Sequence, residues 1–381
     1  MNHEQSKTRP VMNRGFKGLE ERVLSKNLCT ACGACLSLCP YLCSWKGMVA
    51  KLDTCNLEEG RCYAYCPRTE VNPNETYRAV FGKDYDEIEL GPTLKILMGR
   101  AKRPAFIRKG QTGGVVSSLV DFAMKDQIIQ SALLTYRNKN LIPSGKIISK
   151  RKDILTCAGS SYISGPTLES FNQGSWKGKI GIVGLPCQVL ALARMRASSL
   201  EKKTPIEQIG LVIGLFCTWA LDHRLFLAFL NQATGDHPIQ KLNITPPPDR
   251  FLEVTTQGKF YRIPVEEVRP FIRPGCKVCP DMTAELSDIS VGTVEGKEGW
   301  NTVVVRTETG KGLLRRAKKA GMIETKPLPK DHLNHLKEAS LLKKRRALDA
   351  LQEKGGIEKA YFTLPGRLIE RILSETEGIS P

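Results

Sequence analysis

The feature that most constrains the fold of this 381-residue chain is a run of cysteines between residues 29 and 67, where eight of its 13 cysteines lie. The first four are spaced C-x2-C-x2-C-x3-C and a proline follows them: Cys29, Cys32, Cys35 and Cys39. Three thiolates two residues apart can surround one 4Fe–4S cubane, while the fourth points toward a second cubane. The spacing, which is that of bacterial-type ferredoxins, therefore predicts an iron–sulfur module.

A second run, CYAYCP at residues 62–67, repeats the end of the first. Because ligands cross between the clusters of two-cluster ferredoxins, the ligands predicted for the first cluster are Cys29, Cys32, Cys35 and Cys66. Those predicted for the second are Cys39, Cys55, Cys62 and, by count alone, Cys43. The six residues that separate Cys55 from Cys62 depart from the ferredoxin pattern. Zinc and disulfides are alternatives, but zinc favours two separated cysteine pairs and disulfides favour an exported chain.

Four further cysteines lie outside this module, in GLPCQ, GLFC and RPGCKVCPD: Cys187, Cys217, Cys276 and Cys279. Cys187 and Cys217 each follow an apolar run that predicts a buried strand, and in an open α/β sheet ligands bind at the carboxyl ends of the strands. We therefore predict a third 4Fe–4S centre. The alternatives are a structural zinc, or two unrelated buried cysteines with a redox dithiol. Cys157 is left over and is interpreted as a buried structural cysteine.

The remaining patterns predict an α/β core with a mixed, partly parallel sheet, joined to an N-terminal ferredoxin-like α+β iron–sulfur module. Strands alternate with helices along the core, as in SALLTYR, in KGKIGIVGLPCQVLALARMRA and in IGLVIGLFC with the helix after it. TLKILMGRAK (93–102) is predicted as a helix and LLKKRRALDALQEKG (341–355) as an exposed helix. The predicted divisions are a flexible N-terminus, the iron–sulfur module, the core and a basic helical tail: residues 1–20, 21–90, 91–326 and 327–381.

Composition and charge limit the cellular compartment and the kinds of binding partner that we expect. No apolar run approaches the roughly 18 residues that span a bilayer, and the N-terminal residues lack the apolar stretch of a secretory signal. We therefore expect a cytoplasmic protein without a transmembrane segment. The net charge of +18 raises the possibility of nucleic-acid binding. However, the chain shows no helix-turn-helix, RNP or classical zinc-finger pattern, so an acidic redox partner or an anionic cofactor is the better interpretation.

Seven motifs occur in one order along the chain: QTGGVVSSLV, AGSSYIS, GLPCQ, GLFC, RPGCKVCPD, SDISVG and GWNTVVVRTETG. Together they resemble the beta subunits of the deazaflavin (coenzyme F420) hydrogenase/dehydrogenase family, which has relatives in formate dehydrogenases and in chlorophyll hydroxymethyl reduction. The resemblance covers about residues 29–321. It is specific for the family but not for a substrate.

The resemblance implies a subunit that carries FAD as well as iron–sulfur clusters, so that residues 91–326 would bind both. In the family the glycine-rich turn and the small-residue turn help to bind FAD, which points to Thr112, Gly113, Gly114 and Ser160. Asn301 and Thr302 could reach the flavin edge, although a hydrogen-bonded strand start is the alternative for them. Two positions depart from the family: GTVEG lacks an acidic residue after its first glycine, and Ser161 stands where many relatives have lysine.

The implied function is that of an oxidoreductase subunit that moves electrons between 4Fe–4S clusters and FAD. The Cys187 set would lie nearest the flavin, which would exchange hydride with a soluble carrier such as the deazaflavin coenzyme. The expected partner is a redox subunit or a ferredoxin within a hetero-oligomeric complex. The alternative is a non-catalytic relay subunit of a formate dehydrogenase, hydrogenase or disulfide reductase complex.

No side-chain acid or base is assigned to catalysis. The five histidines have no convincing partner in the sequence, and we expect each to lie at the surface. They are His3, His223, His237, His332 and His335.

Overall fold

The structure is a computed structural model that describes residues 13–138, 140–174, 177–235, 237–245, 249–353, 364 and 366–378. The start of the expected flexible N-terminus, the proline triplet at 246–248 and the last two residues of the helix predicted at 341–355 lie outside these ranges. No helix in the described part of the chain is long and apolar enough to span a membrane.

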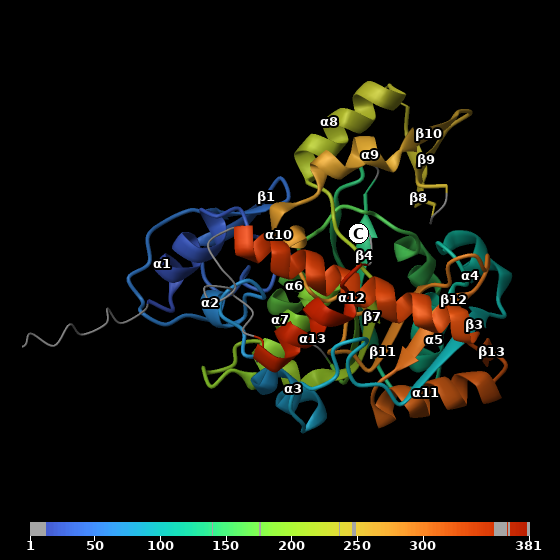
Figure 1. Ribbon diagram of the computed structural model, residues 1–381, viewed down its shortest axis with the longest axis horizontal. Helices are drawn as coiled ribbons and strands as arrows, with labels where there is room; N and C mark the ends of the chain where they lie inside the picture. Colours follow the sequence, from blue (N-terminus) through green and yellow to red (C-terminus); the bar gives the residue numbers. More distant parts are fainter. Residues whose placement is uncertain are drawn as a thin grey trace, which may run out of the picture.

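An eight-stranded mixed sheet lies at the centre of the molecule (Figure 1). From one edge to the other its strands are β13 (Ile323–Pro327), β3 (Lys95–Ala101), β12 (Asn301–Val305), β11 (Ile289–Thr293), β7 (Ile209–Leu215), β6 (Ile180–Gly184), β4 (Ser131–Arg137) and β5 (Pro143–Ile148). The four strands from β11 to β4 are parallel, and the outer pairings are antiparallel. The predicted α/β core with a mixed, partly parallel sheet is therefore confirmed.

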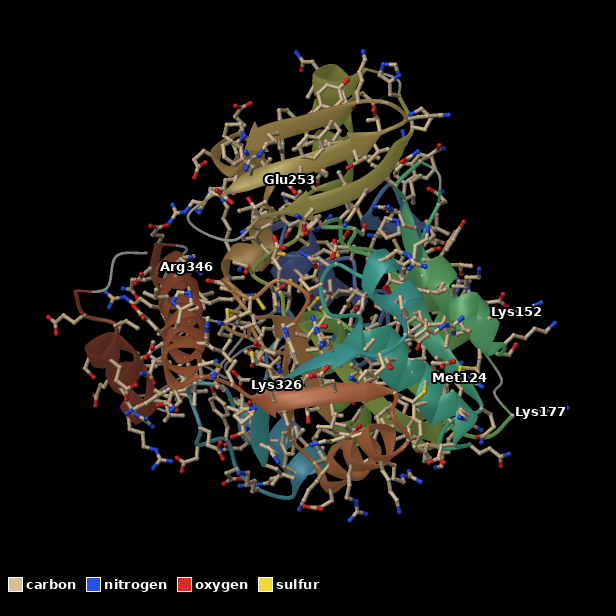
Figure 2. The ribbon with its side chains drawn as sticks, turned by 90° about the vertical axis from the view of Figure 1, so that its right-hand side faces the viewer. Met124, Lys152, Lys177, Glu253, Lys326 and Arg346 are labelled. Carbon is tan, nitrogen blue, oxygen red and sulfur yellow. The ribbon has the colours of Figure 1, made fainter. Side chains whose placement is uncertain are left out.

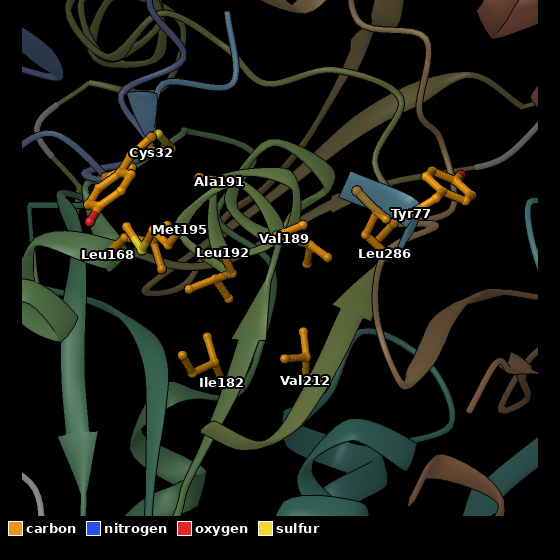
Figure 3. Packing of buried hydrophobic residues seen from close by; sticks show 14 of the residues in the cluster. Cys32, Tyr77, Leu168, Ile182, Val189, Ala191, Leu192, Met195, Val212 and Leu286 are labelled. Carbon is orange, nitrogen blue, oxygen red and sulfur yellow. The ribbon is translucent and has the colours of Figure 1, made fainter. Parts of the chain in front are cut away.

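Helices cover both faces of this sheet. Helix α7 (Pro186–Ala197) packs on one face, where Figure 3 shows its Val189 and Leu192 above Ile182 and Val212 of β6 and β7. Helices α5 (Val115–Lys125) and α11 (Glu308–Lys319) bury their apolar sides against the other face. Strands β6 and β7 are almost wholly apolar because a parallel strand covered on both faces has no side in water.

The helix predicted at residues 93–102 is wrong, because most of this segment forms strand β3. Leu97 and Met98 are adjacent and both buried. A strand that is covered on both faces buries adjacent side chains, whereas a helix with one apolar side does not need to. Strand β3 pairs with β12 on one side and with β13 on the other. Pairing with two distant segments decides the conformation here, and a local pattern does not contain that information.

The cysteine-rich N-terminal segment contains little regular structure. Its elements are α1 (Phe16–Leu19), a π-helical turn (Glu20–Leu24), the hairpin β1 (Leu42–Trp45) and β2 (Met48–Lys51), α2 (Arg61–Ala64) and α3 (Pro73–Phe81). Phe16 and Leu19 are buried, so the described end of the segment expected to be flexible is packed in place. The segment docks directly on the core, because the Leu168 amide donates to the Cys32 carbonyl at 3.1 Å and Asn172 Nδ2 donates to the Leu36 carbonyl at 2.8 Å.

A small subdomain stands on the core, as Figure 2 shows with Glu253 labelled on its sheet. It consists of α8 (His223–Thr234) and an antiparallel sheet of β8 (Ile239–Ile244), β9 (Phe251–Thr256) and β10 (Phe260–Pro264). The short helices α9 (Val265–Val268) and α10 (Pro274–Lys277) lead the chain back to the core.

The chain ends with helices α12 (Lys330–Glu353) and α13 (Gly366–Glu375). Helix α12 lies across the molecule beside the cysteine-rich segment (Figure 1). The prediction that its second half is exposed is wrong, because Leu341, Lys343, Lys344 and Leu348 are buried. A charged helix can cover a core when its apolar residues face inward and its lysine stems pack against other elements.

Candidate redox site

The first predicted set of thiols lies together in the cysteine-rich segment. Burial raises the pKa of Cys35 well above its ordinary value, and the nearby thiols of Cys29, Cys32 and Cys66 raise it further. Burial, followed by the thiol of Cys66, likewise raises the pKa of Cys32 to about 12. Thiols influence one another in this way only at short range. The structure therefore brings together the four residues that the spacing assigns to one cluster.

The loop that carries this set requires a glycine. Gly33 has a φ of +88°, and a Cβ there would lie 2.6 Å from the Glu169 amide nitrogen and 2.7 Å from the Pro166 carbonyl oxygen. Only glycine can combine this left-handed conformation with such close packing on the core. The C-x2-C-x2-C loop is thus shaped by its contact with the core as well as by its own cysteines.

Three of the four residues predicted for the second set lie close together. Burial raises the pKa of Cys62 to about 11, and the thiols of Cys39 and Cys55 act in the same direction. Cys43 lies on strand β1 opposite Ala50, within the hairpin. The structure places thiols from two loops and from helix α2 in this set, while the role of Cys43 stays a prediction.

The position of Cys43 gives a direct test. If Cys43 is a neighbour and not a ligand, Cys43→Ser should keep the full iron content. If it is a ligand, the variant should lose about four irons per chain, which is one cubane. Iron and sulfide quantification of the anaerobically purified variant, beside the wild-type protein, measures the difference. We expect the full iron content, because the thiols of Cys39 and Cys55 act on Cys62 and Cys43 belongs to the hairpin ladder.

The third set is assembled by the edge of the central sheet. Cys187 begins α7 directly after β6, and Cys217 follows β7, so both stand at the carboxyl ends of neighbouring parallel strands. Cys276 and Cys279 come from α10 and the turn after it. Burial raises the pKa of Cys217, and the thiols of Cys276, Cys187 and Cys279 raise it further. The four predicted residues therefore lie together.

The three sets form a row. The thiol of Cys62, in the second set, contributes to the raised pKa of Cys35, in the first. Burial raises the pKa of Cys187, in the third set, and the strongest contribution from another thiol comes from Cys32, in the first. The first set thus lies between the other two.

Buried cations surround this row, and sequence analysis missed them. Arg68 is 2 % exposed and donates to the Pro67 carbonyl at 2.8 Å and to the Gly275 carbonyl at 3.0 Å. It therefore bridges the end of the first set to the C-x2-C turn of the third. Arg273 is also buried and donates to the Cys29 carbonyl at 3.0 Å. Part of the positive charge that we assigned to partner recognition thus lies inside the protein, beside the thiols.

Two thiols of the third set, those of Cys187 and Cys279, line a cavity of about 30 Å³ together with Arg68 and Lys344. Among the described residues, no three thiols, imidazoles or carboxylates stand close enough to hold one metal ion. A four-iron cluster is larger than a single ion, so the thiols that bind it stand further apart than those of a mononuclear site. All the cysteines of the described chain are free thiols.

The glycine-rich turn lies beside the start of β12. Asn301 Nδ2 donates to Thr112 Oγ1, and the Val115 amide donates to Asn301 Oδ1 at 3.3 Å. Gly114 caps α5 with a φ of +69°, and a Cβ on Gly113 would lie 2.8 Å from Asn301 Oδ1. The structure therefore brings together four residues predicted to contact the flavin. It also shows that Asn301 fixes the turn to the sheet.

Thr302 and Ser160 stand slightly apart from this group. Thr302 is buried and its hydroxyl donates to the Thr293 carbonyl at 3.2 Å, as expected of a strand start. Ser160 Oγ donates to Gln111 Oε1, next to Thr112. Gln111 in turn donates to the Tyr162 hydroxyl at 2.7 Å, so it ties the small-residue turn to the glycine-rich turn.

The small-residue turn also contacts the subdomain. The Tyr162 hydroxyl accepts from the Ile244 amide at 2.9 Å, and burial raises the pKa of Tyr162 to about 12. Arg137, at the end of β4, donates to the Ser160 carbonyl at 3.1 Å and to the Gln240 carbonyl at 3.2 Å. Gln111, Tyr162 and Arg137 are residues of this region that sequence analysis missed, because isolated polar residues in loops carry no motif.

The turn and the third thiol set share one edge of the central sheet. Strand β11 is parallel to β7, and Thr293 at its carboxyl end is opposite Asn301. Asn301 is in turn opposite Gly99, near the carboxyl end of β3. The glycine-rich turn and Cys217 therefore both lie at the edge where the carboxyl ends of β3, β11 and β7 meet, which is the edge where α/β sheets bind ligands.

One histidine differs from the expectation of a surface position, and another has a partner that the sequence did not show. His335, on α12, is exposed as expected, and its Nε2 lies 2.6 Å from Glu295 Oε2 in the loop between β11 and β12. His223 is buried at the start of α8 and is not at the surface. His237 is exposed and His332 is half-buried, while His3 lies outside the described residues.

Comparison with known protein families gives two adjacent matches. Residues 96–172 match the family model for the N-terminal part of the coenzyme F420 hydrogenase/dehydrogenase beta subunit, and residues 177–331 match the model for the C-terminal part of the same protein. Both the glycine-rich turn and the third thiol set lie inside these ranges, while the first two thiol sets and most of α12 lie outside them.

Individual proteins agree with these matches. The coenzyme F420 hydrogenase subunit beta of Methanothermobacter thermautotrophicus is 28% identical over 68% of this chain and 94% of that protein. One subunit of the F(420)H(2) dehydrogenase of Methanosarcina mazei is 28% identical over 76% of this chain and 82% of that protein. A chain of the xenon-derivatised F420-reducing [NiFe] hydrogenase complex from Methanosarcina barkeri superposes with a TM-score of 0.66 at 24% identity, covering 72% of this chain and 97% of that chain.

Proposed function

Because this chain belongs to the coenzyme F420 hydrogenase/dehydrogenase beta-subunit family, we propose that it is an iron–sulfur flavoprotein subunit that moves electrons between 4Fe–4S clusters and FAD. When bound, the flavin supplies the exchange between hydride and single electrons, and a soluble deazaflavin carrier is the proposed hydride partner. The observation that carries this proposal is the row of three thiol sets that ends at the sheet edge of the glycine-rich turn.

The thiol sets have the chemistry that iron–sulfur clusters need. The first and third sets each supply four cysteines, and soft thiolates are the ligands that such clusters prefer. Burial raises the pKa of Cys66 to about 11 despite the opposing charges of Arg194 and Arg68. Iron binding would offset this effect, because a ligating thiol is deprotonated by the metal. The residues present therefore supply four thiols each for the first and third clusters and three for the second, and the Cys43→Ser variant tests whether Cys43 is the fourth ligand of the second.

The small-residue turn and the glycine-rich turn also offer groups that can bind an anionic cofactor. The hydroxyls of Ser161 and Ser164 are buried and have no hydrogen-bond partner within the described residues. Both belong to the small-residue turn, AGSSYIS at residues 158–164, which also contains Ser160. Buried polar groups are normally paired, so these hydroxyls are available to a ligand. Helix α5 begins at the glycine-rich turn, and the positive end of its dipole favours a phosphate there.

The second thiol set is the proposed point of contact with the external redox partner. Cys39, Cys55 and Cys62 are all partly exposed, whereas Cys32, Cys35 and Cys66 of the first set are buried. Electrons would then pass from the second set through the first to the third. The residues of the first set are held in this middle position by their hydrogen bonds to the core.

The test is one anaerobic preparation of the full chain, in which iron, sulfide and flavin are quantified. About 12 irons and one FAD per chain would support three cubanes and a flavin. The same sample is then mixed with reduced deazaflavin carrier, and bleaching of the cluster absorbance is followed. Zinc in place of iron, or a lack of flavin, would contradict the proposal. Iron and flavin without any reaction with the carrier would favour the non-catalytic relay subunit.

A further inference from the structure

Helix α12 carries two consecutive lysines into the interior of the protein. Lys343 is 4 % exposed and Lys344 is 2 % exposed. Both lie beyond residue 331, where the match to the family model ends. Arg346, labelled in Figure 2, marks the same part of the helix at the side of the core. The two lysines therefore lie outside the part of the chain that matches the family models.

The two lysines have different partners. Lys344 Nζ forms an ion pair with the buried carboxylate of Glu285. Lys343 Nζ donates to the carbonyl oxygen of Cys217, in the third thiol set. Successive helix residues point about 100° apart, so one helix can direct adjacent side chains to two different sites.

Lys343 lies beside the third thiol set, because its ammonium group is hydrogen-bonded to the Cys217 carbonyl and its charge is felt at the thiols of Cys217, Cys276 and Cys279. Asp281 is the carboxylate within the field of Lys343, and it is shared with Lys344.

Burying an ammonium group is unfavourable unless an anion offsets the loss of hydration. For Lys344, the carboxylate of Glu285 is this anion. The hydrogen bond of Lys343 is to a carbonyl, which carries only a partial charge. A cubane with four thiolate ligands is an anion, and it would supply the missing charge at this position.

We propose that Lys343 raises the reduction potential of the cluster held by Cys187, Cys217, Cys276 and Cys279. This inference rests on the proposed function, because it requires that cluster. An added electron makes the cluster more negative, and a buried cation beside it stabilises the reduced form more than the oxidised form. The C-terminal helix would thus adjust the driving force of the last step before the flavin.

The experiment is an EPR-monitored redox titration of the full-length protein. The signal of the third cluster is identified as the one that is lost in Cys276→Ser. Lys343→Gln removes the charge but keeps a donor for the Cys217 carbonyl, and Lys343→Arg keeps the charge. The matched control is Lys337→Met, which removes one exposed cation, paired with Glu89 at 3.2 Å, from the same helix.

We expect the midpoint potential of the third cluster to become more negative in Lys343→Gln and to stay near the wild-type value in Lys343→Arg and Lys337→Met. An unchanged potential in Lys343→Gln would overturn the inference while leaving the proposed function intact. Loss of the cluster from Lys343→Gln would also overturn it, since the lysine would then hold the cluster instead of adjusting it. Absence of the third signal from the wild-type protein would overturn both proposals.

Discussion

Cys276→Ser is expected to lose about four irons per chain and to interrupt electron transfer between the N-terminal clusters and the flavin. Cys276 is half-buried and lies beside the thiols of Cys217 and Cys279. Serine preserves the size of the side chain and its hydroxyl is a poor ligand for iron. The loss of activity should exceed the roughly 10–100-fold typical of losing an outer partner of a metal ligand.

Two measurements make this prediction specific. The reduced carrier should still reduce the bound flavin in Cys276→Ser, because the glycine-rich turn is untouched, whereas reduction of the N-terminal clusters should fail. The matched control is Cys157→Ser, since Cys157 is half-buried beside Thr156 and belongs to none of the three sets. If Cys276→Ser retained the full iron content and normal cluster reduction, the third set would not be a cluster site.

The thiol sets could be predicted from the sequence because their positions follow local rules. The spacing of Cys29, Cys32 and Cys35 fits the size of one cubane, and it can be recognised without knowing how distant loops pack. Cys187 and Cys217 each end an apolar strand, and parallel strands bring their carboxyl ends to one edge. Neither step needs knowledge of distant contacts.

The surroundings of the thiols could not be predicted in the same way. Arg68 and Arg273 lie next to cysteine motifs, yet arginine is usually exposed and its burial depends on carbonyl groups that other loops provide. Lys343 comes from a helix that is about 60 residues further along the chain than the C-x2-C turn. Its charged pattern is typical of a solvent-exposed helix, and only tertiary packing shows which side is covered.

The surroundings of the glycine-rich turn were also only partly predictable. Two glycines before an apolar helical pattern predict a turn that enters a helix, and the family resemblance pointed to Thr112, Gly113 and Gly114 within it. Its supports, Gln111 and Tyr162, were missed because their hydrogen bonds connect three segments that are far apart in the sequence. Strand β3 was assigned to the wrong element for the same reason, since its two partners are more than 200 residues away.

The second large effect is expected for Lys344→Met, which should lower the stability of the protein by about 3–5 kcal/mol. The side chains of Lys344 and Glu285 are 2% and 6% exposed, and their ion pair joins α12 to the segment that follows the C-x2-C turn. Tyr77 also donates to Glu285, so the carboxylate joins three elements. Methionine fills a similar volume, and the main consequence is therefore a buried carboxylate without its cation.

The double variant Lys344→Met/Glu285→Gln separates the charge from the packing. It removes both charges, while the glutamine carbonyl can still accept from the Tyr77 hydroxyl, so most of the lost stability should return. Thermal unfolding of anaerobic samples, followed by circular dichroism, should show a fall on the order of 10 °C for the single variant and a much smaller one for the double variant. Equal losses in both would mean that α12 is held by packing alone and that its buried cations are not fixed by charge. Because Lys343 is the next residue along the same helix, that result would also remove the reason for its precise placement beside Cys217.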